Sequence, residues 1–353
     1  MKTEIAIVGA GPIGIELAVA LKGEGIPYVH LEAGQVGTTI GWYAPQTRFF
    51  SSPERIAISG VPLQTLDQSK ATREEYLLYL RTVVQQYDLQ IRSYEPVDRI
   101  EETKGGFLLH STAGGATHTT AARRVVLAIG DMHLPRTLGI PGEDLPHVSH
   151  YFEDPHRYFR RHVLIVGGKN SAVEAAIRCY RCGARVTLSY RQEDLNPKRI
   201  KFWLMPEIRA MIRDGSIEFL PSTAPQEILG DRVVLSRVGD GDRDKAGPTE
   251  NGSFEVPADF VLLMTGYRQD SSLFEGLGLR LEGPGKRPWV NPTTMETSLP
   301  GVYVAGTASA GTQMAGVKAF IETSHIHVER ILAAVTGRPP RQDLERSYEL
   351  PES

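Results

Sequence analysis

Four residues near the start of the chain have the types and the spacing needed to hold a dinucleotide. Gly9, Gly11 and Gly14 form a G-x-G-x-x-G turn after an apolar run, and Glu32 follows at about the usual distance of 20 residues. In such a turn the first glycine permits the tight bend, the second lets backbone N–H groups approach a pyrophosphate, and the third lets helix and strand pack closely. Glu32 can accept hydrogen bonds from both hydroxyls of a ribose. Residues 4–32 therefore predict a dinucleotide-binding βαβ unit.

A second unit of the same pattern follows in the middle of the chain. An apolar strand is expected over residues 161–166, a turn over Gly167–Ala172, a helix to about Cys182, and a strand over residues 185–190. Ala172 is an accepted substitute for the third glycine. Two such units predict that the chain binds two nucleotides.

Basic residues stand where the second unit lacks an acid. Arg191 follows the strand, with Lys198, Arg199 and Lys201 close behind. An arginine at this position suits the 2′-phosphate of NADP, while a solvated basic loop is the alternative. Lys169, in place of the middle glycine, is expected either to lie against phosphate or to face solvent.

Composition excludes several other classes. The chain has 353 residues, 41% of them hydrophobic, and 39 basic against 42 acidic residues give a net charge of −3. This balance gives no electrostatic reason to expect nucleic acid or an anionic membrane as a partner. No apolar run reaches the ~18 residues of a membrane span, and no signal peptide is recognisable, so a cytoplasmic location is expected. Two cysteines imply no disulfide framework.

The remaining elements are predicted from periodicity and turn residues. The long polar stretch over residues 33–60 is expected to line or cover a ligand. A helix is expected over residues 73–87 and a long amphipathic helix over residues 314–334. Residues 135–155, rich in proline, read as a linker. Short strands are expected over residues 89–92, 96–100, 107–111 and 117–120, forming a small meander. Buried strands are expected over residues 124–129 and 260–264, and residues 300–307 are expected to form a strand that enters a glycine turn.

The chain resembles the two-dinucleotide flavoprotein oxidoreductases of the thioredoxin-reductase-like branch, and within it the bacillithiol disulfide reductases. The matching segments run from the first strand to the last helix. They are GAGPIG at the start, QTRFFSSPERIAISGVP from Gln46, HYFEDPHRYF from His150, VLIVGGKNSAVEAA from Val163 and YVAGTASAG from Tyr303.

The resemblance implies an α/β fold with two Rossmann-like domains, in which an FAD domain is split by an inserted NADPH domain. The implied boundaries are 1–145 and 269–353 for the FAD domain and 146–268 for the NADPH domain. FAD is expected at Gly9, Gly11, Pro12, Ile13, Gly14, Glu32, Gln46, Thr47, Val97, Gly130, Gly306 and Thr307. NADPH is expected at Gly167, Gly168, Lys169, Asn170, Ser171, Ala172, Arg191, Lys201 and Gly266.

The chain departs from this family at its thiols. Thioredoxin reductases carry a C-x-x-C before the second unit, where this chain has no cysteine, and Ile13 stands where the bacillithiol branch usually has one. Cys179 and Cys182 form a C-x-x-C at the C-terminal end of a helix, where the dipole opposes a thiolate. We therefore expect two ordinary, partly buried cysteines and assign no catalytic residue.

Histidines are the candidate proton donors of the chain. His150, His156, His325 and His327 are each open to a role near the flavin or to ordinary packing. No cysteine–histidine cluster has the spacing of a metal site.

The predicted activity is hydride transfer from NADPH to FAD and then to an acceptor. The favoured acceptor is a small-molecule disulfide, which requires a bacillithiol-disulfide-reductase-like enzyme without the usual active cysteine. A small redox protein such as flavodoxin or ferredoxin, oxygen in a flavin monooxygenase, and a non-enzymatic NADPH-sensing role are the alternatives. A homo-oligomer is expected.

Overall fold

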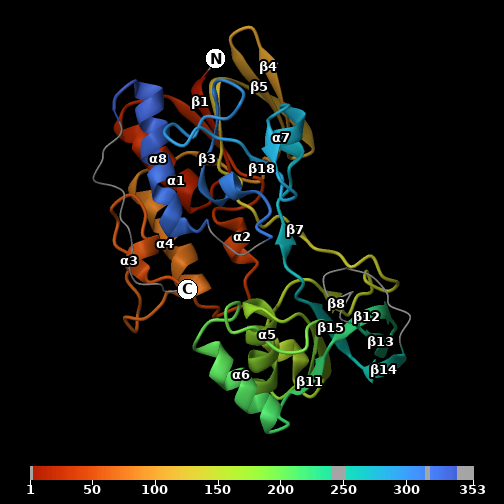
Figure 1. Ribbon diagram of the computed structural model, residues 1–353. Coiled ribbons are helices and arrows are strands. Elements are labelled where there is room, and N and C mark those ends of the chain that lie inside the picture. The colour runs from red at the N-terminus through yellow and green to blue at the C-terminus, as the bar shows by residue number, and fades with distance from the viewer. Residues whose placement is uncertain (1–2, 240–251, 315–318, 340–353) are drawn as a thin grey trace. The chain divides into compact units, whose positions relative to one another are not determined.

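The computed structural model describes residues 3–239, 252–314 and 319–339. Its contacts divide the chain into two compact units. Unit 1 comprises residues 1–41, 46–134 and 267–353, and unit 2 comprises residues 42–45 and 135–266. The mixed α/β architecture with parallel sheets confirms the predicted fold class (Figure 1).

Unit 1 is built on a seven-stranded sheet. Its strands lie in the order β3-β2-β1-β6-β5-β4, with β19 paired to β6. The β1, β2, β3, β6 and β19 pairings are parallel, whereas β4, β5 and β6 are antiparallel neighbours. The strands are β1 (Thr3–Val8), β2 (Tyr28–Leu31), β3 (Ile91–Arg92), β4 (Val97–Thr103), β5 (Gly106–Ala113), β6 (Ala116–Leu127) and β19 (Val302–Val304).

Helices cover this sheet, and the start of the first helix is marked by a proline in its sequence. Helix α1 (Pro12–Gly23) begins with proline at its first position, where no intrahelical N–H bond is needed. It lies beside α8 (Ile321–Thr336), as Figure 1 shows. Helix α4 (Arg73–Gln86) begins at a capping box formed by Thr72 and Glu75. The other helices of unit 1 are α2 (Thr38–Gly41), α3 (Pro53–Ile56), α7 (Ser272–Gly276) and the 3-10 helix η2 (Gly306–Ala310).

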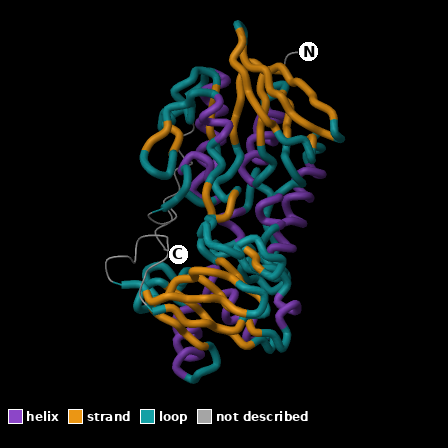
Figure 2. Tube along the Cα trace, turned by 90° about the vertical axis from the view of Figure 1, so that its right-hand side faces the viewer, coloured by secondary structure: helices purple, strands orange, loops and turns teal. Residues whose placement is uncertain are grey.

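The meander was predicted correctly in kind and wrongly in one detail. Residues 117–120 and 124–129 were expected as two strands, but β6 runs without a break. Its first half pairs with β5, and its second half pairs with β1 and β19, so hydrogen bonds are available along its whole length. In Figure 2 these long strands extend from the sheet of unit 1.

Unit 2 contains a five-stranded parallel sheet in the order β11-β10-β9-β15-β8. These strands are β8 (Val148–Ser149), β9 (His162–Val166), β10 (Arg185–Tyr190), β11 (Glu218–Pro221) and β15 (Phe260–Leu263). A three-stranded antiparallel sheet follows, made of β12 (Thr223–Ile228), β13 (Arg232–Arg237) and β14 (Ser253–Pro257). Its helices are α5 (Asn170–Arg181), α6 (Leu204–Arg213) and the 3-10 helix η1 (Pro155–Tyr158).

Short strand pairs complete the fold. They are β7 (Leu134–Pro135) with β16 (Tyr267–Arg268), and β17 (Leu281–Glu282) with β18 (Arg287–Pro288).

Two sequence expectations need correction. The stretch over residues 135–155 is not only a linker, because β8 within it pairs with β15 and extends the parallel sheet. The last helix begins at Ile321, seven residues later than expected, after Phe320 in an extended conformation; residues 315–318 lie outside the described part. The polar stretch over residues 33–60 contains α2 and α3.

Candidate functional site

The first glycine turn has the geometry that its three glycines predict. Gly9 has a φ of +106°, and a Cβ there would lie 2.5 Å from the carbonyl oxygen of Ala128. A Cβ at Gly14 would lie 2.0 Å from the carbonyl oxygen of Gly9. Both positions therefore exclude any side chain, because backbone atoms of the neighbouring strand and turn occupy the space.

Gly11 differs from the other two glycines. A Cβ there would meet no heavy atom of the described chain within 4 Å. Gly11 is also the N-cap of α1, and no side chain caps this helix. The first N–H groups of a helix have no intrahelical acceptor, and the helix dipole adds positive potential there. This open, uncapped turn fits a pyrophosphate.

Glu32 lies beside this turn, as the sequence predicts. One carboxylate oxygen accepts the N–H of Ala10 at 2.6 Å, and the other accepts the N–H of Gly34 at 2.8 Å. The residue is 8% exposed. Each oxygen keeps further lone-pair capacity, so the fixed carboxylate can still accept from ribose hydroxyls.

Gly130, Gly306 and Thr307 lie at the carboxyl ends of the adjacent strands β6 and β19. Gly130 and Gly306 have φ values of +77° and +73°. A Cβ at Gly306 would lie 3.5 Å from the side chain of Ile13, so Ile13 packs against the turn that follows β19. The glycine turn after β1, which also pairs with β6, lies at the same sheet edge.

Asp131 adds a carboxyl group that was not predicted. Burial raises its pKa, although hydrogen bonds from Gln313 and Thr307 oppose the shift. The amide of Gln313 donates to Asp131 at 2.8 Å. Gln269 is buried nearby, and its amide donates to the carbonyl oxygens of Gly130 and Ala308.

Gln46, Thr47 and Val97, which were also predicted for FAD, lie in unit 1, and their neighbours belong to other parts of that unit. The N–H of Gln46 donates to the carboxylate of Glu74, and the carbonyl of Thr47 accepts the N–H of Arg73, so both adjoin the start of α4. Val97 begins β4, close to the point where the N–H of Glu95 bonds the carbonyl of Glu32. Their contacts with FAD stay a prediction.

Unit 2 repeats the glycine turn with different chemistry. Gly167 has a φ of +147°, and a Cβ there would lie 2.6 Å from the carbonyl oxygen of Met264. A Cβ at Gly168 would lie 2.4 Å from the ring of Tyr190. Lys169 is the N-cap of α5, and no side chain caps this helix.

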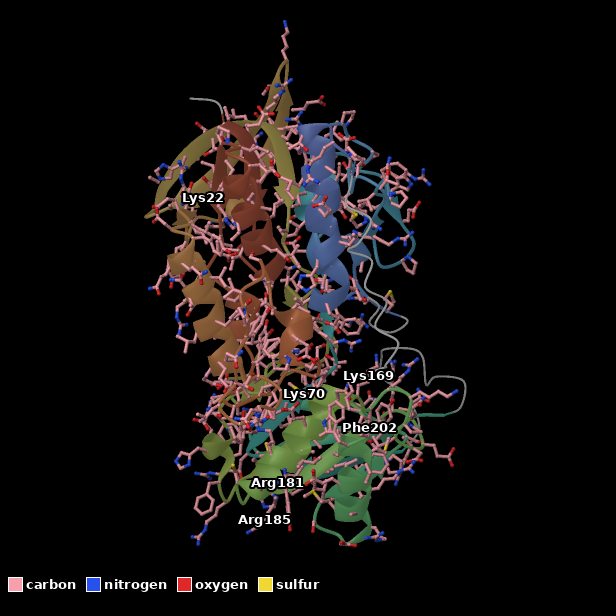
Figure 3. All side chains as sticks on the ribbon, turned by 90° about the vertical axis from the view of Figure 1, so that its left-hand side faces the viewer. Lys22, Lys70, Lys169, Arg181, Arg185 and Phe202 are labelled. Carbon is pink, nitrogen blue, oxygen red and sulfur yellow. The ribbon has the colours of Figure 1, made fainter. Side chains whose placement is uncertain are left out.

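Cations gather at this turn. Burial lowers the pKa of Lys169, and the charges of Arg199, Arg136 and Arg191 lower it further. Figure 3 labels Lys169 on unit 2. Such a group of cations at an uncapped helix start fits phosphates.

Asn170 and Lys201 are linked in this region. The side-chain oxygen of Asn170 accepts the backbone N–H of Lys201 at 2.8 Å, which holds the basic loop at the turn. Lys201 is 9% exposed. Arg191 and Arg199 are exposed, and the contacts of Arg191 and Lys201 with a 2′-phosphate stay a prediction. Gly266 has a φ of +95°, and its carbonyl accepts the N–H of Arg136.

The cysteines are placed as ordinary residues. Cys179 is fully buried in α5, and burial raises its pKa to about 12. Cys182 follows the last turn of the same helix. Both belong to unit 2, and neither lies at the helix start.

The four histidines also have defined surroundings. His150 lies 3.5 Å from Glu143, and His156 lies in η1. His327 accepts the N–H of Gly306 through Nδ1 at 3.2 Å, and burial lowers its pKa to about 4. His325 lies within hydrogen-bond distance of the carboxylate of Glu16 and the backbone carbonyl of Arg55.

In residues 3–239, 252–314 and 319–339, no three histidine, cysteine or acidic side chains group together as metal ligands would. None of the helices in these ranges has both the length and the apolar character needed to cross a membrane.

Comparison with known proteins identifies the family. The model of the pyridine nucleotide-disulphide oxidoreductase family matches residues 6–306, and the chain belongs to this family. It is an oxidoreductase that uses FAD and NADPH. The bacilliredoxin reductase Bdr of Bacillus subtilis is 35% identical over 332 residues, which cover 94% of this chain and 97% of the relative.

Other relatives and solved structures agree with this assignment. The bacillithiol disulfide reductase Bdr of Bacillus cereus superposes with a TM-score of 0.87 at 31% identity, covering 96% of this chain and 99% of that one. A ferredoxin–NADP reductase of Ignicoccus hospitalis is 26% identical over 85% of this chain and 88% of its own. The thioredoxin reductase of T. acidophilum, at 20% identity and a TM-score of 0.71, shares the fold.

Several residues of the site escaped sequence reasoning. His30, Asp131, Gln269 and Gln313 all lie at or below the carboxyl edge of the unit 1 sheet. A histidine inside an otherwise apolar strand, two residues before the acid, was the one local signal. The others are brought together only by the tertiary fold.

Proposed function

We propose that this protein passes electrons from NADPH through FAD to a low-molecular-weight disulfide of the bacillithiol type, without using a cysteine of its own. When bound, NADPH supplies a hydride to FAD, and the flavin supplies two electrons to the acceptor. The overall reaction consumes NADPH, one proton and a disulfide, and it yields NADP⁺ and two thiols.

The observation that carries the proposal is the combination of identity and site geometry. The chain matches the B. subtilis bacilliredoxin reductase along 94% of its length, and it keeps both uncapped helix starts. In this proposal Gly9, Gly11, Pro12, Ile13, Gly14 and Glu32 hold FAD, and the turn Gly167–Ala172 with Arg191 holds NADPH.

The direct route from flavin to disulfide follows from the placement of sulfur. Ile13 occupies the first glycine turn and packs on Gly306, and the pKa of buried Cys179 is far above neutral pH. A thiolate is needed for thiol–disulfide exchange. Cys182 lies at the end of α5 away from the nucleotide turn, so the proposed reaction includes no mixed disulfide with either cysteine.

A one-electron protein acceptor is the second candidate. Ferredoxin–NADP reductases are 26% and 27% identical to this chain over 85% or more of its length, and a protein acceptor needs no thiol in the enzyme. Flavin monooxygenases at 20% identity share only the fold, so oxygen as the acceptor has weaker support.

Location and assembly are further parts of the proposal. We infer a cytoplasmic homo-oligomer on the basis of the family resemblance. Multi-angle light scattering of the holoenzyme tests the assembly, and a monomeric mass would contradict it.

An acceptor panel tests the proposed activity. Holoenzyme supplied with NADPH is offered bacillithiol disulfide, thioredoxin, flavodoxin, ferredoxin or oxygen, each before and after treatment with iodoacetamide. The proposal expects the fastest NADPH oxidation with bacillithiol disulfide and no loss after alkylation. Turnover with flavodoxin or ferredoxin alone would favour the second candidate, and protein that takes up no FAD would overturn both.

A further inference from the structure

His30 is an unusual occupant of its strand. It lies on β2 between apolar neighbours and is 1% exposed. Its Nε2 lies 2.9 Å from the carbonyl oxygen of Gly9, so Nε2 must carry the proton that it donates. Its Nδ1 is buried without a hydrogen-bond partner.

The imidazole is neutral in this position. Burial lowers the pKa of His30 to about 4, and the hydrogen bond to Gly9 offsets only part of that shift. A neutral imidazole with Nε2 protonated leaves Nδ1 as a bare acceptor, and an unpaired buried acceptor costs free energy. An aliphatic residue would remove the unpaired Nδ1 but would leave the carbonyl oxygen of Gly9 without its donor, so the hydrogen bond to Gly9 is what the histidine contributes beyond packing.

The Gly9–Ala10 peptide explains what the imidazole does. His30 donates to the carbonyl of this peptide, and Glu32 accepts its N–H at 2.6 Å. In a trans peptide these two groups point in opposite directions. His30 in β2 and Glu32 just after this strand therefore hold a single peptide plane from both sides.

The neighbouring backbone groups are fixed in the same way. The N–H of Gly9 donates to the carbonyl of Leu31 at 2.8 Å, and the carbonyl of Ala10 accepts the N–H of Gly37 at 3.0 Å. All four polar groups of Gly9 and Ala10 are thus held by other parts of unit 1. The first unpaired N–H groups of the turn come directly after this clamped peptide, at the start of α1.

The carbonyl of Gly9 also limits the approach of α1. A Cβ at Gly14 in α1 would lie only 2.0 Å from this carbonyl oxygen. A rotation of the Gly9–Ala10 peptide would move this oxygen relative to α1 and shift the N–H groups that face a ligand.

We propose that His30 is a positioning residue for FAD, which together with Glu32 locks the Gly9–Ala10 peptide so that the start of α1 meets the pyrophosphate. This inference rests on the proposed placement of FAD in unit 1. It assigns His30 a role in binding the pyrophosphate-containing half of the cofactor, without contact to the flavin ring.

The test compares ligands with and without the pyrophosphate. His30→Leu and His30→Phe remove the donor, and His30→Gln retains an N–H donor. Apoprotein of each variant is titrated with FAD, with ADP and with adenosine, and its unfolding in urea is measured in parallel. His110→Leu, which alters a histidine on β5 of the same sheet, is the matched control.

The donor-less variants are expected to bind FAD and ADP about five- to tenfold more weakly, which is the size of one net hydrogen bond. Adenosine affinity and the urea midpoint of the apoprotein should change little, because the variants exchange one unpaired acceptor, Nδ1, for another, the Gly9 oxygen. His30→Gln should recover most of the FAD affinity.

Two results would overturn the inference while leaving the proposed function intact. One is FAD binding by His30→Leu and His30→Phe within twofold of the wild type. The other is an equal loss for ADP and adenosine, which would indicate a purely structural role. A wild-type apoprotein that binds no FAD would instead overturn the proposed function, and this inference with it.

Discussion

Nδ1 of His325 lies 2.8 Å from a carboxylate oxygen of Glu16, and its Nε2 lies 2.9 Å from the carbonyl oxygen of Arg55. Both neighbours are acceptors, so the ring satisfies both only when it carries two protons. Burial lowers the pKa of His325, but the hydrogen bond and charge of Glu16 outweigh this effect, and the pKa is raised. The imidazolium therefore ties α8 to α1 and α3.

This ion pair predicts a pH-dependent stability. Because the folded pKa is raised, the contribution is complete below about pH 6.5, the unfolded value, and is lost as the pH rises through the folded pKa. We expect the free energy of unfolding to fall by about 1–2 kcal/mol between pH 6 and pH 9. Urea unfolding at a series of pH values measures this change. Glu16→Gln is expected to flatten the pH dependence of the unfolding free energy, whereas His118→Gln, an exposed control, should leave that dependence unchanged. An unchanged slope in Glu16→Gln would refute the assignment.

Arg191 is predicted to select NADPH over NADH. Its exposed guanidinium lies among the cations at the second glycine turn, and a charge-assisted bond to a 2′-phosphate contributes about 1.5–3 kcal/mol. Arg191→Ala should weaken NADPH binding roughly tenfold to hundredfold and leave NADH unchanged. Stopped-flow reduction of the flavin measures both.

Arg185→Ala provides the control for that experiment. Arg185 lies at the start of β10, and Figure 3 shows it well apart from Lys169. Equal losses for NADPH and NADH in Arg191→Ala would show that Arg191 does not read the 2′-phosphate.

Gly11 and Gly14 should respond to alanine in opposite ways. A methyl group at Gly11 meets open space, so the Gly11→Ala apoprotein should melt within about 2 °C of the wild type. If that space holds the pyrophosphate, FAD affinity should fall at least tenfold, or about 1.4 kcal/mol. Gly14→Ala should instead destabilise the apoprotein by about 1–3 kcal/mol, because its methyl group meets the Gly9 oxygen. Calorimetry and flavin titration separate the two, and full FAD affinity in Gly11→Ala would contradict the site.

Turnover should not depend on the cysteines. Cys179 is buried with a pKa of about 12, and Cys182 lies at the opposite end of α5 from the nucleotide turn. The double variant Cys179→Ser with Cys182→Ser should keep its rate of NADPH oxidation within about twofold, although loss of the buried sulfur should lower its melting temperature. A rate reduced by tenfold or more in folded protein would place a thiol in the reaction.

The local patterns in the sequence were sufficient for the two βαβ units. Gly9, Gly14 and Gly167 are required by close backbone contacts, and such requirements leave a visible mark in the sequence. The capping box at Thr72 likewise marks the start of α4.

Long-range pairing was beyond the same reasoning. Residues 148 and 149 form a strand only because they pair with Val261 and Leu262 of β15, which lie 113 residues later in the sequence. The contact between His30 and Gly9 spans 21 residues, and the contact between Gln313 and Asp131 spans 182. Neither hydrophobic periodicity nor secondary-structure propensity indicates contacts between residues so far apart in the sequence.

The position of Ile13, whose side chain packs on Gly306, affects how the protein should respond to peroxide. Enzymes that react through an exposed thiolate lose activity when peroxide converts it to sulfinic or sulfonic acid. An aliphatic residue at this position offers no sulfur to peroxide, so the proposed reductase should keep regenerating thiols under conditions that inactivate enzymes with a catalytic thiolate.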